Sequence, residues 1–171
     1  ITVPALVLGG WYDLYAGQAF EQFNGLRLHG GSDEARQSQL IMGPWPHHLG
    51  NDLSTAPRTG DIDFGASSVV NVDAVERAWF DQWLKEDGDP SLDRPPLRLF
   101  VMGVNRWQDE HEWPLARTDW QQWNLHSQGS ANSVRGDGEL RLDAPTEQPH
   151  DEFVYDPQFP VQTVGGANCC S

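Results

Sequence analysis

Two short apolar runs with a helical stretch between them open the chain, and this order constrains the fold more than any other feature of the sequence. The first run, residues 2–9, is bounded by Gly9-Gly10, as expected of a strand buried on both faces of a parallel sheet. Residues 16–29 repeat apolar side chains at helical spacing and stop at Gly30. The second apolar run covers residues 38–43. Together they predict a βαβ unit and hence an α/β fold.

The middle of the chain adds one more predicted helix. Residues 44–71 are rich in Gly, Pro, Asp, Ser and Asn, and a connection of this length is typical of a functional loop or one draped over the surface. Helical spacing returns over residues 72–85, where Asp73 and Glu76 resemble a capping box. The aromatic residues of this helix are expected in the core: Trp79, Phe80 and Trp83.

The pattern changes around Asp89-Pro90, and we predict a domain boundary between residues 93 and 94. Residues 94–171 contain short strand-like runs separated by turn-rich segments, as in part of an antiparallel sandwich. The predicted strands of this unit are residues 97–102, 120–125, 139–142 and 152–155. Four tryptophans are expected to pack within this unit or against its neighbour: Trp107, Trp113, Trp120 and Trp123.

The chain is strongly acidic, with 25 Asp and Glu residues against 11 Lys and Arg and a formal net charge of −14. This balance disfavours nucleic acid and anionic membranes as partners, because both are bound largely through Lys and Arg. No apolar stretch approaches the roughly 20 residues of a membrane span, so we expect a soluble protein of unassigned compartment. Cys169 and Cys170 are adjacent, which disfavours a disulfide between them. The acidic residues around His111 lack metal-ligand spacing, and we expect no metal and no other cofactor.

Two residues suited to acid–base chemistry follow the two predicted strands. Asp13 comes just past the first strand, and His47 comes just past the second, within Gly43-Pro44-Trp45-Pro46-His47-His48. Catalytic groups of open α/β sheets gather at the carboxyl ends of strands, and α/β-hydrolases place a triad acid and then a triad histidine after late strands. Each residue alone also suits an ordinary role, as a turn former or a loop histidine. Their order and placement together favour an acid–base pair.

Five ordered segments carry a family resemblance. They are P-A-L-V-L-G-G-W-Y-D, G-P-W-P-H, D-F-G with A-W-F-D-Q-W-L-K, L-R-L-F-V-M-G-V-N-R-W, and Y-D-P with P-V-Q-T-V-G-G. Over almost its whole length the chain resembles the bacterial cocaine-esterase-like hydrolases and their X-Pro dipeptidyl-peptidase and α-amino-acid ester hydrolase relatives. The resemblance implies that Asp13 is the acid and His47 the base of a serine hydrolase triad. It also implies that residues 1–93 are the C-terminal portion of an α/β-hydrolase domain, and residues 94–171 the start of a jelly-roll domain of the galactose-binding-like type.

The chain departs from the family pattern in three respects. No G-x-S-x-G occurs in the 171 residues, so the nucleophile is expected upstream and this chain alone is expected to be inactive. Pro46 stands where serine is common, and His48 lies one place beyond the motif. Leu14 and Tyr15 follow the acid where the amino-ester hydrolase branch carries acidic residues, which favours an apolar acyl or aromatic pocket. The candidate lining residues, for which ordinary packing is the alternative, are Trp11, Tyr12, Leu14, Tyr15 and Leu49.

The predicted function of the intact protein is hydrolysis of a small acyl ester, amide or peptide through an acyl-enzyme. The sequence leaves open the choice among esters, X-Pro peptides and acylated β-lactam-like amides, and it leaves open whether the protein forms a homo-oligomer. Two other readings stay open. The chain could be a non-catalytic jelly-roll module that binds carbohydrate or another ligand, or it could be an inactive, truncated pseudoenzyme.

Overall fold

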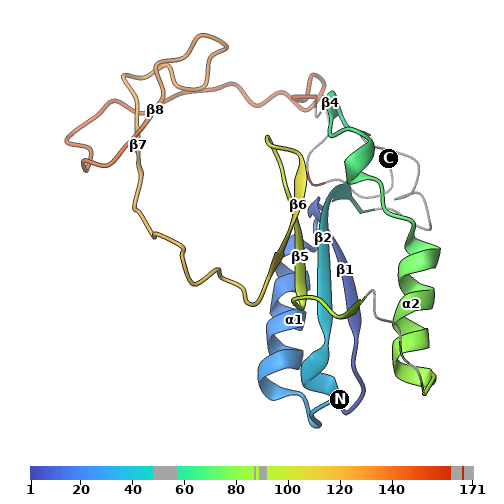
Figure 1. The fold of residues 1–171 in the computed structure, drawn as a ribbon. Coiled ribbons are helices and arrows are strands. Elements are labelled where there is room, and N and C mark those ends of the chain that lie inside the picture. Colours follow the sequence, from blue (N-terminus) through green and yellow to red (C-terminus); the bar gives the residue numbers. More distant parts are fainter. Residues whose placement is uncertain (48–57, 87, 89–91, 163–166, 168–171) are drawn as a thin grey trace. The chain divides into compact units, whose positions relative to one another are not determined.

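The computed structural model describes residues 1–47, 58–86, 88, 92–162 and 167 of the chain (Figure 1). Two compact units are present, the first containing residues 1–116 and the second residues 117–162. Among the described residues, no helix is long and apolar enough to cross a membrane.

The first unit is built on a four-stranded sheet with the order β1-β2-β5-β6. Strands β1 (Leu6–Tyr12), β2 (Gln39–Pro46) and β5 (Leu97–Val101) run parallel, and β6 (Arg106–Glu110) is antiparallel to β5. Helix α1 (Ala16–His29) connects β1 to β2. The mixed sheet with its helices confirms the α/β prediction and the βαβ order.

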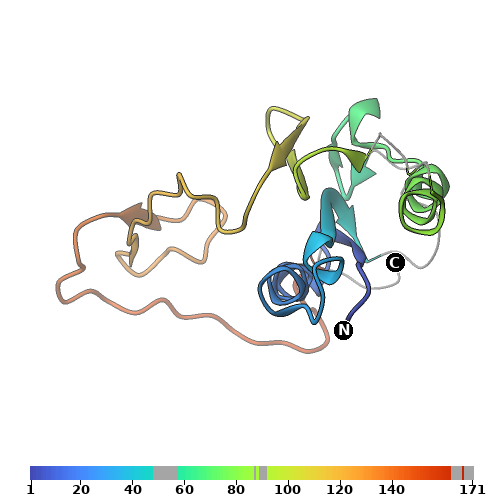
Figure 2. The same ribbon diagram turned by 60° about the horizontal axis from the view of Figure 1, so that its bottom comes forward.

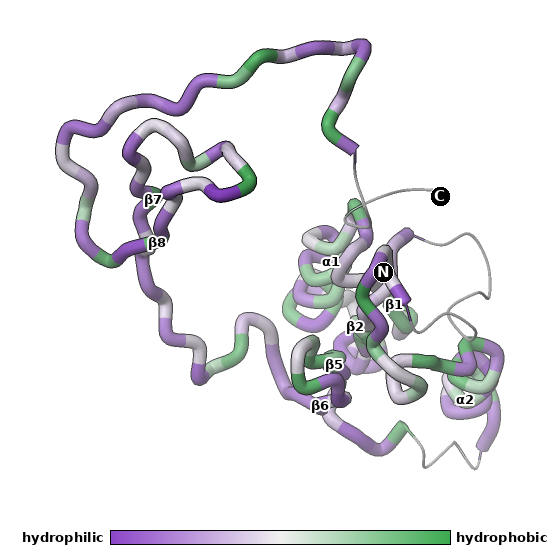
Figure 3. The backbone as a smooth tube through the Cα atoms, turned by 90° about the horizontal axis from the view of Figure 1, so that it is seen from above, coloured by the Kyte–Doolittle hydropathy of each residue, from purple (hydrophilic) through white to green (hydrophobic). Residues whose placement is uncertain are grey.

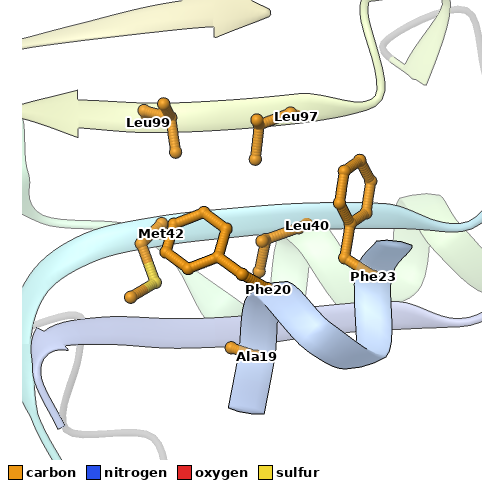
Figure 4. Close-up of a cluster of buried hydrophobic side chains, with 7 residues drawn as sticks. All are labelled: Ala19, Phe20, Phe23, Leu40, Met42, Leu97 and Leu99. Carbon is orange, nitrogen blue, oxygen red and sulfur yellow. The ribbon is translucent and has the colours of Figure 1, made fainter. Parts of the chain in front are cut away.

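Helix α1 buries one face against the sheet, as its apolar spacing predicts. Phe23 is 1% exposed, and with Ala19 and Phe20 it packs on side chains from β2 and β5. Figure 4 shows the cluster formed by Ala19, Phe20, Phe23, Leu40, Met42, Leu97 and Leu99. Figure 2 shows α1 and the second helix on opposite sides of the sheet. The segments that follow β1 and β2 therefore extend from the same packed sheet and helix.

Truncation at the centre of this cluster should be costly. Phe23→Ala is expected to lower the free energy of unfolding of the first unit by about 3–5 kcal/mol, because it removes a buried ring and leaves a cavity. Urea denaturation followed by circular dichroism measures the loss. The matched control is Phe80→Ala, which removes a ring that is 57% exposed and should change stability by less than about 1 kcal/mol. Equal losses in the two variants would contradict this description of the core.

The observed strands are shifted toward their carboxyl ends relative to the prediction. The first begins at Leu6 rather than residue 2 and runs on to Tyr12, and the second continues to Pro46. Pro4 cannot donate to a strand ladder, and the backbone N–H of Ala5 is taken by the Ser38 hydroxyl at 2.9 Å. The strands therefore end next to Asp13 and His47.

The second helix, α2 (Val72–Leu84), lies where it was predicted, but its cap and one of its aromatic residues differ. Asn71 is the N-cap and accepts a hydrogen bond from the backbone of Ala74 at 3.0 Å, so the expected capping box at Asp73 is wrong. Trp79 is 6% exposed and packs beside Trp83, whereas Phe80 points to solvent and is not a core residue. Helical geometry turns Phe80 away from the buried stripe because it directly follows Trp79.

Short elements complete the first unit. The single-turn helices η1 (Ala35–Gln37) and η3 (Ala66–Ser68) precede β2 and α2, and strands β3 (Arg58–Thr59) and β4 (Ile62–Asp63) pair in an antiparallel hairpin.

The first compact unit extends to residue 116 and so includes residues 94–116, whereas the domain boundary predicted after residue 93 stays a prediction. Strand β5 pairs with β2 and places Leu97 and Leu99 in the core of the first unit. Pro95-Pro96 does not separate β5 from the sheet of the first unit. The carbonyl of Pro96, just before β5, accepts a hydrogen bond from the backbone N–H of Leu40 in β2 at 2.9 Å. Strand β6 was not predicted, since its sequence R-W-Q-D-E lacks an apolar run.

The second unit is small, and hydrophilic and hydrophobic residues are mixed along it, as Figure 3 shows. Strands β7 (Asn124–His126) and β8 (Glu139–Arg141) form an antiparallel pair, so only part of the predicted run 120–125 is strand, and residues 152–155 are not. Trp120 and Trp123 are 78% and 53% exposed, so they do not pack in a core within this unit, and packing against a neighbouring unit stays a prediction. Other large apolar side chains of this unit, among them Leu125, Leu140 and Phe153, are exposed as well and do not gather into a core.

Candidate active site

Asp13 lies in the tight turn that joins β1 to α1. Its backbone N–H donates to the carbonyl of Gly10 at 3.1 Å, and its own carbonyl accepts from Ala16 in the first turn of α1 at the same distance. The carboxylate oxygen Oδ1 accepts from the backbone N–H of Tyr15 at 2.7 Å. This side-chain bond two residues ahead is typical of Asp in turns, and it leaves the second carboxylate oxygen, Oδ2, available.

His47 directly follows β2, and its Nδ1 lies 3.0 Å from Asp13 Oδ2. The two side chains come from turns 34 residues apart in the chain. Parallel pairing of β1 with β2 brings them together, because it sets Tyr12 opposite Pro46, one residue before each member of the pair. The two side chains singled out in the sequence are thus in contact. The exposed fractions of the side chains are 15% for Asp13 and 29% for His47, so the imidazole still reaches solvent.

The geometry assigns a direction to this hydrogen bond. An ionised carboxylate only accepts, so Nδ1–H of His47 donates to Asp13 and leaves Nε2 as the basic nitrogen of the neutral ring. The ring of Tyr15 lies edge-on to the imidazole, with 5.3 Å between centroids and 74° between planes. An aromatic side chain and a carboxylate therefore hold the imidazole on two sides.

Two hollows adjoin the pair. One, of about 440 Å³, is lined by β1, by the first turns of α1 and by Asp13, Tyr15 and His47. The other, of about 200 Å³, is lined by the same pair with Gly10 and Trp45. Hollows of about 650 and 700 Å³ elsewhere in the first unit do not include the pair. We identify the site by its chemistry rather than its size, because the larger hollows bring together no acid–base pair of this kind.

The five predicted lining residues have different positions. Tyr15 lines the 440 Å³ hollow beside His47. Trp11 packs between Phe20 and Trp113 and donates to the carbonyl of Phe100 at 2.8 Å, which makes it a packing residue.

Of the remaining three, the two that the structure describes, Tyr12 and Leu14, do not line these hollows. Tyr12 lies against Phe64, with 6.0 Å between ring centroids, and Leu14 is 40% exposed. Leu49 lies outside the described residues.

Sequence reasoning missed several residues that line the hollows, and three of them have large side chains. Gln18 and Gln22 line the 440 Å³ hollow from α1, and Trp45 lines the 200 Å³ hollow from β2. The spacing of four between the two glutamines puts them on one helix face, a signal that was available once Asp13 was placed at the start of that helix. Trp45 is 3% exposed, and a large apolar residue of this kind is expected in the core rather than at the wall of a hollow.

The acidic cluster around His111 lies away from this site. Asp109 is in β6, and its carboxylate is 3.8 Å from the guanidinium of Arg98. Within the described ranges, no group of three or more His, Cys, Asp or Glu side chains is arranged to hold a metal ion.

The sequence matches known hydrolases in the region that contains this pair. Residues 1–49, which include both Asp13 and His47, match the family described as X-Pro dipeptidyl-peptidase (S15 family). The chain is 32% identical over 169 residues to the cocaine esterase of Rhodococcus sp. (strain MB1 Bresler), covering 97% of this chain and 28% of that protein. The chain therefore spans little more than a quarter of the length of this relative.

A solved structure supports the fold. An aminopeptidase from a marine sediment Thaumarchaeota archaeon superposes with a TM-score of 0.62 at 24% identity, covering 94% of this chain and 24% of that one. At this identity the likeness concerns the fold alone. Both sequence matches include the two segments that follow β1 and β2, which contain Asp13 and His47. They place this chain in the cocaine-esterase-like X-Pro dipeptidyl-peptidase (S15) family of hydrolases.

Proposed function

We propose that this chain supplies the acid and the base of a serine hydrolase that cleaves esters through an acyl-enzyme. The observation that carries the proposal is the 3.0 Å contact between Asp13 Oδ2 and His47 Nδ1, at the carboxyl ends of two adjacent parallel strands. The nucleophilic serine lies on sequence that precedes this chain in the intact protein, and the chain alone is inactive. Membership of a hydrolase family supports this assignment.

The proposed reaction has two proton transfers at His47. As the serine oxygen attacks the substrate carbonyl, Nε2 of His47 takes the hydroxyl proton, and the C–O bond to the leaving group breaks as that proton is passed on to the leaving group. Water then repeats the sequence on the acyl-serine and releases the acid. Asp13 accepts from Nδ1–H throughout, and so stabilises the imidazolium that forms in each step.

The residues beside the pair support an ester with an apolar or aromatic acyl group. Tyr15 offers an aromatic ring next to His47, and Val7, Leu8 and Ala19 give the same hollow apolar lining. Among the described residues that line the two hollows, Asp13 supplies the carboxylate, and it is already paired with His47. A substrate ammonium would need a further carboxylate partner. Peptides with a free amino terminus are therefore the less favoured substrates.

A kinetic comparison in the intact protein tests this proposal. Mixing with a p-nitrophenyl ester of an aromatic acid should release a burst of nitrophenol close to one equivalent per active site, as expected for an acyl-enzyme that hydrolyses slowly. The value of kcat/KM should exceed that for an Xaa-Pro p-nitroanilide by at least about tenfold, since a missing charge partner costs more than about 1.4 kcal/mol. A higher kcat/KM for the anilide would instead support a dipeptidyl-peptidase, and no turnover of either substrate would support a pseudoenzyme.

We also propose that the second unit is part of a jelly-roll domain. The antiparallel pairing of β7 with β8 supports this assignment, as do the apolar side chains that the unit leaves exposed, including Leu125, Leu140 and Phe153 at 60–80%. In a complete sandwich, a second sheet would cover such residues. The alternative that this unit binds carbohydrate stays a prediction.

A further inference from the structure

Gly10 occupies the point where the ends of β1 and β2 approach most closely. A Cβ atom added to Gly10 would lie 2.0 Å from the carbonyl oxygen of Trp45 and 3.4 Å from Cβ of Asp13. Trp45 is two residues before His47. The absence of a side chain at Gly10 therefore leaves room both for the turn that carries Asp13 and for the segment that carries His47.

The close approach arises from an irregularity in the strand pairing. Gly10 pairs with Gly43, and the next pair is Tyr12 with Pro46, so β2 has one more residue than β1 between these two pairs. An extra residue bends its strand locally and re-aims the side chains that follow. Here the bend carries the Trp45 carbonyl toward β1, and His47 follows directly.

Trp45 is not free to retreat from a side chain at position 10. Its ring is 3% exposed, and its Nε1 donates to the carbonyl of Ser68 at 3.2 Å. The preceding carbonyl, that of Pro44, accepts from the Thr59 hydroxyl at 2.8 Å. Asp13 is tied to the same point from the other side, since its N–H donates to the Gly10 carbonyl. A clash at Gly10 must therefore be relieved by moving the turn that bears Asp13, the segment that leads to His47, or both.

We infer that Gly10 is a positioning residue that sets the distance between Asp13 and His47. The expected loss of turnover rests on the proposed function, whereas the expected change in the distance between Asp13 and His47 does not. Real Cβ contacts essentially never fall below 3.0 Å, so alanine at position 10 requires a displacement of about 1 Å or more. Misplacement on this scale is enough to reduce turnover by about 100-fold. The backbone at Gly10 is an ordinary strand conformation, so the effect of alanine there is steric and not conformational.

Nuclear magnetic resonance of the His47 ring in the 171-residue chain tests the geometric step. In the unsubstituted chain, the Nδ1 proton should be observed downfield and slow to exchange, because it is held by Asp13. Gly10→Ala should abolish this signal or shift it to the position seen in Asp13→Ala. In the intact protein, the same substitution should lower kcat about 100-fold.

Two glycines of α1 provide matched controls. Alanine at Gly17 or at Gly25 would meet nothing within 4 Å. Both controls should keep the His47 signal and retain kcat within about threefold. A retained signal in Gly10→Ala, or an equal loss in Gly17→Ala, would overturn the inference.

A second variant distinguishes a loss of folding from a loss of the contact between Asp13 and His47. If Gly10→Ala alone does not fold, the double variant with Trp45→Phe keeps a ring in place but removes the hydrogen bond to Ser68, which lets the carbonyl move. This variant should fold and still lack the His47 signal. If it too fails to fold, Gly10 serves the whole sheet and the inference is wrong. Loss of the signal together with normal turnover of Gly10→Ala would keep the positioning role but refute the proposed function.

Discussion

Replacing His47 by alanine in the intact protein should lower kcat for an aryl ester by about 10⁶-fold, which corresponds to about 8 kcal/mol of transition-state stabilisation. The reason is that both proton transfers of the proposed reaction pass through this imidazole. Without it the serine hydroxyl is a poor nucleophile and the leaving group departs unprotonated. Stopped-flow measurement of nitrophenol release gives both the burst and the steady-state rate, and both should fall.

His29→Ala is the matched control for this prediction. His29 is an exposed imidazole at the last residue of α1, about 20 Å from the turn that holds Asp13 if the helix rises 1.5 Å per residue. Its loss should leave kcat within about twofold and cost at most about 1 kcal/mol of stability, through the helix dipole. Turnover of His47→Ala within tenfold of the unsubstituted protein would refute the role of His47 as the base.

Asp13→Asn should lower kcat by about 10⁴-fold while leaving the fold intact. The structure gives a specific reason for this result. The backbone N–H of Tyr15 donates to Oδ1 at 2.7 Å, so the asparagine must place its carbonyl oxygen there and turn its NH₂ group toward His47. Nδ1 of His47 then has to accept, its proton moves to Nε2, and the ring can no longer take a proton from the serine.

The tautomer is the observable that tests this explanation. Nitrogen chemical shifts of His47 should change from the Nδ1-protonated to the Nε2-protonated pattern in Asp13→Asn. In Asp33→Asn, a substitution of a carboxylate that is 93% exposed and paired with Arg36, they should stay the same. A 10⁴-fold loss of activity without a change of tautomer would show that Asp13 acts by another route, such as support of the turn before α1.

Local patterns were sufficient to predict much of the first unit. The apolar runs and the helical spacing of residues 16–29 predict β1, α1 and β2, and α1 has the predicted ends. Strand β6 could not be predicted, because a polar sequence becomes a strand only when β5 offers a partner edge. The extent of the first compact unit could not be predicted for a related reason. Pro95-Pro96 marks a break in local pattern, and long-range pairing of β5 with β2 continues the sheet beyond it.

The candidate site, too, could be predicted from the sequence only in part. The sequence by itself was enough to single out Asp13 and His47 as the proposed acid and base, since their order and their places after two buried strands follow from local pattern and from the family motifs. It could not determine which neighbours face them. Consecutive residues of a strand point to opposite faces, so Trp11 packs toward α1 and Trp113, whereas Tyr12 contacts Phe64.

Only the tertiary structure decided the distance within the pair and what maintains it. The 3.0 Å contact depends on the register of β1 against β2, on the extra residue in β2, and on the absence of a side chain at Gly10. These features involve residues about 34 positions apart, and no local propensity encodes a distance between two turns. The chemical identity of the pair is therefore a property of the sequence, and its working geometry is a property of the packed sheet.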